Sequence, residues 1–298
     1  AAARTSAMIE SRGRKSPYLF LAPAIIYLGI WIYYPIAKNF YLSFLGTEGT
    51  HGADFRFVGL QNYHQLLSDE LFHRALLHNL VWVLLSILVP VVIGLVLAVL
   101  LVHKRTRLFY SAIFFLPVTV APIMAAVVWG WIYNPTFGAL NQMLTLIGLD
   151  SLAQPWLGDA ATALVSVNMI GSWGYYGFCT LIFLAGLQNI DPEIFEAARI
   201  DGANALQQFR SITLPLLKPT LTFVLVYTTI GSMKFFDIIY VATKGGPDNS
   251  TQIVAVYMFD LFIRQGDVNY AAAMSVVLTA IILAMSLLAI RNMTRKPS

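Results

Sequence analysis

The chain has 298 residues, of which 58% are hydrophobic and 11% are charged, and its formal net charge is +4. A soluble domain carries about 25% charged residues, so one water-facing core could not hide this much apolar surface, and the composition predicts membrane insertion. No basic stripe with interleaved aromatic residues occurs, which argues against nucleic-acid binding. The single cysteine, Cys179, lies in an apolar run, and no Cys/His cluster has metal-ligand spacing. We therefore expect neither an internal disulfide nor a metal site.

Six stretches are long and apolar enough to cross a bilayer as helices, which takes about 20 residues each. They predict an all-α, polytopic membrane protein with six transmembrane helices. The expected spans are residues 18–44, 79–102, 108–133, 162–187, 220–243 and 270–290. This pattern divides the chain into a tail over residues 1–17, a single transmembrane domain over 18–290 and a second tail over 291–298.

Basic residues orient the spans, because loops rich in Lys and Arg stay in the cytoplasm. Most of the 19 basic residues fall before the first span, between the second and third, between the fourth and fifth, and after the sixth. These residues are Arg4, Arg12, Arg14, Lys15, Lys104, Arg105, Arg107, Arg199, Arg210, Lys218, Arg291, Arg295 and Lys296. Both termini are therefore expected in the cytoplasm, with outer segments at residues 45–78, 134–161 and 244–269.

The inner segment between the fourth and fifth spans has the pattern of two short helices joined by a turn. Asp191-Pro192-Glu193 predicts a helix start, with Asp as the cap and Pro at the first helical position. Asp201-Gly202 is expected to end that helix, because Gly accepts turn conformations that other residues resist. A second helix is expected over residues 203–212. The apolar residues of both helices need a partner, or the protein's own helix ends, to cover them.

This inner segment resembles the EAA loop of ABC importer permeases. The matching residues are Glu196-Ala197-Ala198, Asp201-Gly202-Ala203, Phe209, Ile212 and Leu214-Pro215. Further motifs extend the resemblance to the sugar and glycerol-phosphate permeases of bacterial binding-protein-dependent importers. These motifs are Phe57-Val58-Gly59-Leu60-x-Asn62-Tyr63, Leu116-Pro117 with Pro122, Asn134-Pro135-x-x-Gly138-x-x-Asn141 and Thr243-x-Gly245-Gly246-Pro247.

The resemblance implies a multi-pass permease of the bacterial plasma (inner) membrane that forms half of a heterodimeric pore. The implied partners are a second permease subunit, two cytoplasmic ATPase subunits, an extracytoplasmic solute-binding protein, a sugar substrate and the lipid bilayer. No G-x-x-x-x-G-K-[ST] phosphate loop occurs, so this chain is expected to have no catalytic residue and no cofactor of its own. ATP and Mg would be bound by the partner ATPase.

Coupling to the ATPase is assigned by the resemblance to a loop over residues 190–219. The coupling residues are Glu196, Ala197, Ala198, Ile200, Asp201 and Gly202. Glu196 would pair with a basic residue of the ATPase or cap its own helix. The two alanines would keep the helix slim enough to enter a cleft. Asp201 and Gly202 would set the turn, although Asp201 could equally be only a residue that ends the helix.

The fourth span offers candidates for the substrate path, because a water-filled path needs polar or irregular backbone facing the bundle interior. Gly171, Gly174, Tyr175 and Phe178 share one helical face, and the two rings could stack on a sugar. Glycine-rich faces also serve the close packing of membrane helices, and this second interpretation stays open.

The fifth span offers Ser232, Phe235 and Asp237 as further candidates for the path. Lys234 lies one turn from Asp237 and could pair with it, and ionisable residues within a span are functional candidates. Snorkelling of both charges to the interface is the alternative. If both charges face the pore, a neutral hydroxylated solute fits better than a strong ion.

A di- or oligosaccharide is the expected solute. Glycerol phosphate or another polyol is the alternative on the same scaffold, but a glycerol phosphate favours more pore-facing cations than Lys234 alone. A channel would need a selectivity filter or an arginine ladder, and a secondary transporter usually has inverted repeats; the sequence has neither signature.

Overall fold

The computed structural model describes residues 16–48 and 54–294, and these fall into two compact units. One unit holds the residues up to Ser68 together with Leu261–Val277, and the other holds Asp69–Asp260 with the residues after Val277. Helices predominate in both units, which confirms the all-α prediction apart from one short hairpin. Several residues used to orient the chain lie outside the described residues, namely Arg4, Arg12, Arg14, Lys15, Arg295 and Lys296.

The first unit begins with a continuous helical run. It consists of α2 (Ser16–Leu28), the π-helical η1 (Gly29–Tyr33) and α3 (Tyr34–Leu42). The π-helical turn comes directly before Pro35, whose missing N–H removes one bond from the helical ladder. The unit continues with β1 (Leu45–Glu48), β2 (Asp54–Phe57), α4 (Gln61–Ser68), the π-helical η5 (Leu261–Gln265) and the first part of α16 (Val268–Thr294).

The hairpin of the first unit was not expected from the sequence. β1 and β2 pair antiparallel, with Leu45 opposite Phe57. Asn62, from the motif Phe57–Tyr63, donates through Nδ2 to the carbonyl oxygens of Ser43 at 2.9 Å and Leu45 at 2.8 Å. This motif therefore ties α4 to the start of the hairpin, because a buried amide stabilises the fold when its donors find carbonyl partners.

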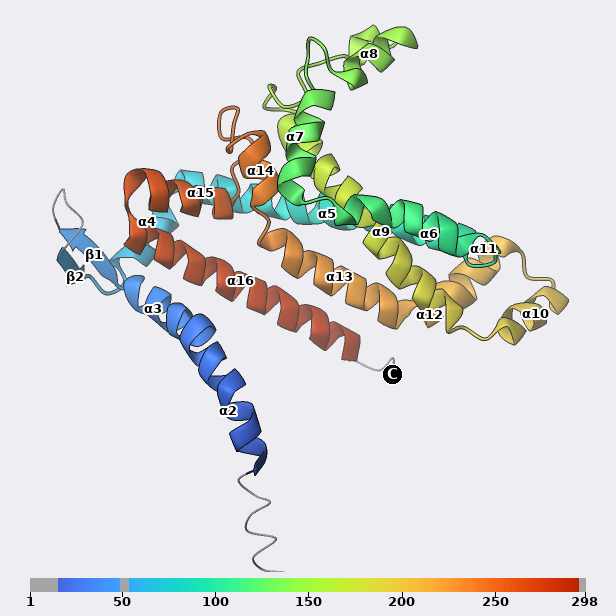
Figure 1. Ribbon diagram of the computed structural model, residues 1–298, viewed down its shortest axis with the longest axis horizontal. Coiled ribbons are helices and arrows are strands. Elements are labelled where there is room, and N and C mark those ends of the chain that lie inside the picture. Colours follow the sequence, from blue (N-terminus) through green and yellow to red (C-terminus); the bar gives the residue numbers. More distant parts are fainter. Residues whose placement is uncertain (1–15, 49–53, 295–298) are drawn as a thin grey trace, which may run out of the picture. The chain divides into compact units, whose positions relative to one another are not determined.

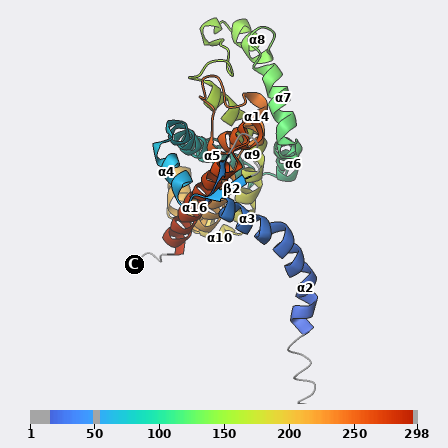
Figure 2. The same ribbon diagram turned by 90° about the vertical axis from the view of Figure 1, so that its left-hand side faces the viewer.

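The second unit is a bundle in which the long helix α5 (Glu70–Leu101) packs along α9 (Ala163–Gln188) and α13 (Lys218–Met233) (Figure 1). Shorter elements complete it: α6 (Arg107–Phe115), η2 (Leu116–Thr119), α7 (Pro122–Ile132), α8 (Ala139–Leu146), η3 (Asp150–Leu152), α10 (Pro192–Ile200), α11 (Ala205–Gln208), η4 (Phe209–Thr213), α12 (Leu214–Leu216), α14 (Asp237–Ala242) and α15 (Val254–Asp260). In both views, α8 and α10 lie far apart within this unit (Figure 2).

Small residues let the helices of the second unit approach closely. A Cβ atom added to Gly94 of α5 would lie 2.5 Å from the Cβ atom of Cys179 on α9. A Cβ atom added to Gly177 of α9 would collide with the carbonyl oxygen of Phe114 on α6. These contacts are typical of membrane helices, where close packing takes the place of a hydrophobic driving force. Cys179 is a buried free thiol, as its apolar sequence context indicated.

Four helical stretches of the described residues are long and apolar enough to cross a membrane by themselves. They are Phe20–Leu42, Glu70–Leu101, Ala163–Gln188 and Val268–Leu288. They overlap the first, second, fourth and sixth predicted spans. Two bent helix pairs pass the same test only when each pair is taken together, which brings the possible number of spans to six.

The third predicted span, residues 108–133, is not the single straight helix that we expected. The segments Arg107–Thr119 and Pro122–Ile132 meet at 93°. Pro122 disfavours helical backbone in the residue before it, and Ala121 accordingly adopts φ −58° and ψ 135°. The prolines of this span therefore divide it into two helices.

The fifth predicted span, residues 220–243, is also interrupted. α13 ends at Met233, and a new helix, α14, starts at Asp237. The intervening Phe235 packs on Trp82 of α5, and Ile239 of α14 is buried in the core. Apolar periodicity could not reveal this break, because tertiary packing overrides the helical preference of a short segment.

Candidate functional site

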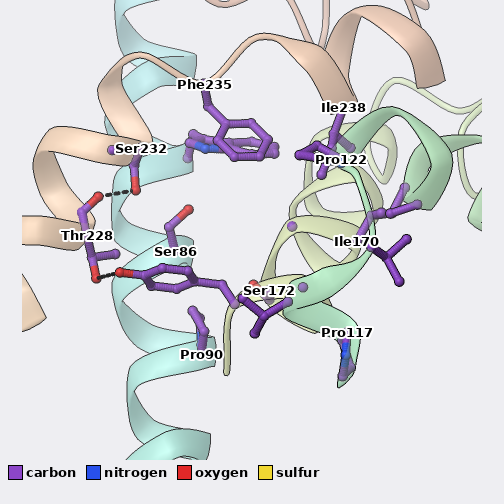
Figure 3. Close-up of a pocket in the computed structure, with 18 of the residues that line it drawn as sticks. Ser86, Pro90, Pro117, Pro122, Ile170, Ser172, Thr228, Ser232, Phe235 and Ile238 are labelled. Carbon is purple, nitrogen blue, oxygen red and sulfur yellow. Dashed lines mark hydrogen bonds between the residues drawn. The ribbon is translucent and has the colours of Figure 1, made fainter. Parts of the chain in front are cut away.

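A central cavity of about 320 Å³ lies in the second unit, where α5, α7, α9 and α13 face one another (Figure 3). α5 contributes Ser86 and Pro90, and Pro122 begins α7. The irregular backbone around η2 supplies Pro117, while Phe235 comes from the break after α13. The two interruptions that the sequence did not predict, before α7 and after α13, thus lie at the cavity. A broken helix can turn backbone and side chains toward the cavity that would face other directions in a continuous helix.

Neutral hydroxyl groups form the polar part of the lining. The hydroxyl oxygens of Tyr175 and Thr228 lie 3.1 Å apart, and the Ser232 hydroxyl donates to the Thr228 carbonyl at 2.6 Å (Figure 3). The Ser86 hydroxyl oxygen accepts from Asn168 Nδ2 at 3.0 Å. No residue in the described lining carries a charge. Such a cavity suits a neutral ligand with several hydroxyl groups, since each protein hydroxyl can both donate and accept.

Aromatic residues also belong to the lining of the cavity. Trp82 is 1% exposed, and its ring centroid lies 5.1 Å from that of Phe235, with 32° between the planes. Tyr175 and Tyr227 also line the cavity. Flat apolar faces beside hydroxyl groups match the chemistry of a carbohydrate, which has C–H faces and a polar rim.

Five of the seven residues predicted for the substrate path line this cavity. They are Gly171, Gly174, Tyr175, Ser232 and Phe235. Phe178 does not line it, but its ring stacks on that of Tyr175 with centroids 5.3 Å apart. Asp237 does not line it either and is exposed at the start of α14. Within the described residues, Asp237 forms no ion pair with Lys234, so the suggested pairing of these two charges is wrong.

Sequence reasoning missed the contribution of α5 to the cavity. Trp82 and Ser86 are four residues apart on that helix, and both line the cavity. A polar residue one turn from a tryptophan inside an apolar span was the available signal. Pro117 and Pro122 were noticed only as motif residues, and their position beside the cavity follows from the bend between η2 and α7.

The predicted coupling residues lie in a segment built from α10, a turn and α11. Asp191 caps α10, because its Oδ1 accepts from the backbone N–H of Glu193 at 3.0 Å. Gly202 follows the helix with φ +81°, a conformation that disfavours a side chain. The backbone N–H of Ala203 then reaches the carbonyl of Ala198 at 2.9 Å. These contacts confirm the expected helix start and turn.

The second helix of this segment differs from the expectation. It starts at Ala205, two residues late, because Asn204 caps it. Asn204 Oδ1 accepts from the Gln207 N–H at 3.0 Å, and Gln207 Oε1 accepts from the Asn204 N–H at 2.8 Å. The helix becomes the π-helical η4 at Phe209, shortly before Pro215 removes a donor from the ladder.

The exposed face of α10 carries several predicted coupling residues. Glu196, Ala197 and Ile200 are all exposed, and Ile200 retains 87% of its accessible surface. Ile200 lies one helical turn from Glu196 and extends the exposed face that carries the predicted coupling residues. Ala198, by contrast, is only partly exposed.

Comparisons with known proteins bear on this arrangement. Residues 90–294 match the family described as "Binding-protein-dependent transport system inner membrane component". The chain is similar to the "Probable ABC transporter permease protein YurN" of Bacillus subtilis (strain 168), with 37% identity over 91% of this chain and 94% of that protein. It is also similar to the "Trehalose/maltose transport system permease protein MalF" of Thermococcus litoralis, with 32% identity over 94% of each.

A solved structure shares the fold. It is described as "Crystal structure of a bacterial ABC transporter involved in the import of the acidic polysaccharide alginate". One of its chains superposes with a TM-score of 0.84 at 23% identity, covering 98% of this chain and 99% of that chain.

Proposed function

The chain belongs to the family of binding-protein-dependent transport system inner membrane components, and we propose that it forms one half of the sugar-conducting pore of an ATP-driven ABC importer. The observation that carries the proposal is the central cavity, whose lining combines aromatic rings with hydroxyl groups and includes no charged residue. A di- or oligosaccharide fits that chemistry. The trehalose/maltose system of the relative from Thermococcus litoralis supports the same solute class.

In the proposed topology, the chain crosses the bacterial inner membrane six times with both termini in the cytoplasm. The bent pair of Arg107–Thr119 and Pro122–Ile132 then supplies the third span. Helices α13 and α14 supply the fifth, and Ala205–Leu216 stays in the cytoplasmic coupling segment. A single permease domain covers residues 18–290. The positive-inside pattern supports this orientation, because most of the basic residues then lie on one side.

In this topology, the broken spans serve the pore. Backbone that leaves helical geometry at membrane depth is tolerated where it is buried in protein or lines a water-filled cavity. The breaks at Val120–Ala121 and at Lys234–Phe236 flank the central cavity. A solute would contact Tyr175, Ser232 and Phe235 there, with Gly171 and Gly174 giving it room. Phe178 would support the Tyr175 ring from behind.

Energy would reach the pore through the coupling segment. The exposed face of α10, with Glu196, Ala197 and Ile200, would enter a cleft on a cytoplasmic ATPase subunit. Asp201 and Gly202 would fix the turn that orients this helix. Two ATPase subunits would bind ATP and Mg, so this chain would have no catalytic role and no cofactor of its own. A second permease subunit would complete the pore, and a solute-binding protein would deliver the sugar from outside.

The experiment that tests this function is reconstitution of the complex. The chain, purified in mild detergent, should bring a second permease subunit and an ATPase pair with it. In proteoliposomes with the solute-binding protein, a labelled disaccharide should accumulate only when ATP is supplied on the ATPase side. Sugar uptake that needs an ion gradient and no ATP would contradict the proposal and favour a secondary transporter.

Glycerol phosphate or another polyol is the alternative solute. The uncharged lining disfavours a phosphate, because a buried anion needs a cation or several donors around it. A binding screen on the partner solute-binding protein separates the two possibilities, since that protein is expected to set specificity.

A further inference from the structure

A second cavity, of about 530 Å³, lies at the root of the coupling segment and has a different chemistry. Its walls come from the end of α5, the start of α6, the end of α9 and the segment from α10 to η4. Arg107, Arg199 and His103 belong to its lining, and no acidic residue does. This basic cavity therefore carries positive charge that no carboxylate of its own lining balances.

The two arginines of the basic cavity have unused donors. Arg107 donates through Nη1 to the Val102 carbonyl at 3.4 Å, a long contact that involves one of its five N–H groups. In the parts of the chain that the structure describes, the Arg199 side chain forms neither a hydrogen bond nor an ion pair. Two guanidinium groups in one cavity present a set of donors that matches the oxygens of a phosphate group.

Helix α10 presents two faces with different chemistry. Pro192, Phe195 and Arg199, spaced three and four residues apart, line the basic cavity. Glu196, on the exposed face proposed to contact the ATPase, does not line it. Arg199 is itself exposed, but it belongs to the lining of the cavity, whereas Glu196, Ala197 and Ile200 do not. A ligand of the cavity would therefore meet Arg199 beside the face proposed to contact the ATPase.

The rest of the lining is aliphatic. Val99 and Val102 come from the end of α5, and Leu187 and Ile190 come from the end of α9. Cations beside an aliphatic wall suit an amphiphile, whose headgroup meets the arginines while its chain meets the apolar side chains. A basic pocket between membrane helices on the cytoplasmic side is a known setting for anionic headgroups.

We propose that the basic cavity binds a phosphate group, supplied by an anionic phospholipid of the cytoplasmic leaflet. Arg107 and Arg199 donate to the phosphate oxygens, and the aliphatic wall contacts an acyl chain. Because one arginine begins α6 and the other lies on α10, the bound lipid connects the coupling helix to the bundle. The proposal rests on the cytoplasmic placement of the coupling segment in the proposed function.

The test is a lipid titration of the full-length chain, delipidated in detergent and followed by native mass spectrometry. Phosphatidylglycerol and zwitterionic phosphatidylethanolamine are compared as ligands. The variant carrying both Arg107→Gln and Arg199→Gln should bind phosphatidylglycerol about tenfold more weakly or worse, because charge-assisted hydrogen bonds are lost. The control Arg210→Gln, an exposed arginine of η4 outside the lining, should bind it like the wild type.

Two further measurements distinguish a lipid from a soluble phosphate and a lost site from a misfolded variant. Millimolar inorganic phosphate should not displace phosphatidylglycerol. If it does, a lipid is not the specific ligand, and the cavity is a site for soluble phosphate instead. Equal affinity in the double variant and the wild type would overturn the site itself, provided that both have the same melting temperature. Neither sugar nor ATPase is present, so a failure of the proposed transport function leaves this result intact.

Discussion

At the residue scale, two candidates from the fifth predicted span, one aromatic and one charged, occupy different positions relative to the central cavity. Phe235 packs against Trp82 inside the cavity, whereas Asp237, two residues later, is exposed outside it. Helical spacing alone could not separate them, because the chain leaves the helix between them. The uncharged lining that results is suited to hydroxyl groups and poorly suited to ions.

Replacing Phe235 by leucine tests the role of the ring in solute binding. Loss of aromatic stacking, worth about 0.5–1.5 kcal/mol, should raise the half-saturating sugar concentration in a proteoliposome uptake assay by roughly two- to tenfold. Asp237→Asn is the matched control and should leave this concentration unchanged, because Asp237 lies outside the cavity. The reverse pattern, with Asp237→Asn weakened and Phe235→Leu normal, would place the solute elsewhere.

Replacing Gly177 by alanine tests the close approach of α9 to α6. The added Cβ atom meets the Phe114 carbonyl, a backbone atom that cannot rotate away, so the folded state should lose about 1–3 kcal/mol. Gly130→Ala on α7 is the control, since nothing lies within 4 Å of its Cβ position. Thermal unfolding in detergent measures both, and equal melting temperatures would show that the two helices separate easily.

At the element scale, the segment α10–turn–α11 is specified mainly by local contacts. Asp191 caps one helix, Asn204 and Gln207 cap the next, and Gly202 provides the turn. Each contact involves residues within three positions of one another, so the sequence could indicate most of it. The late start of α11 was missed because the reciprocal cap of Asn204 and Gln207 went unrecognised. The π-helical η4 was missed because the effect of Pro215 on the preceding turn was not considered.

Replacing Gly202 by valine should disrupt coupling without unfolding the membrane helices. A β-branched residue at φ +81° costs about 1–2 kcal/mol, which the short turn can relieve by reorienting α10. Gly148→Val is a matched control at φ +77° in the segment expected outside the membrane, and neither glycine has an atom within 4 Å of its Cβ position. Co-purification of the ATPase should fall only for Gly202→Val. Equal recovery with both variants would contradict the coupling role.

At the scale of the whole molecule, composition places the chain in a membrane, and the basic residues give its proposed orientation. The described structure supplies four helices that could span a bilayer by themselves and two bent pairs that could do so together. The segment over residues 134–161 and the coupling segment, both in the second unit, are proposed to face opposite sides of the membrane. This proposal is open to a direct labelling test.

Cysteine labelling in cells tests the orientation, and the buried Cys179 can first be replaced by serine. A cysteine at exposed Ala160, in the segment proposed to lie outside, should react with an impermeant maleimide in intact spheroplasts. A cysteine at exposed Ser211 of η4 should react only after the membrane is permeabilised. If Ser211→Cys is labelled in intact spheroplasts, the proposed orientation is wrong. The coupling segment and the basic cavity would then not lie on the cytoplasmic side.

The sequence by itself determined the membrane class, the helical content, the capped helix with its Gly202 turn and the family resemblance. These features depend on composition, on apolar runs and on contacts between near neighbours, all of which are readable along the chain. Only the tertiary structure decided where the third and fifth predicted spans break, that Trp82 and Ser86 join the cavity, and that Asp237 stays out of it. Those outcomes depend on packing between residues far apart in sequence, which local pattern does not encode.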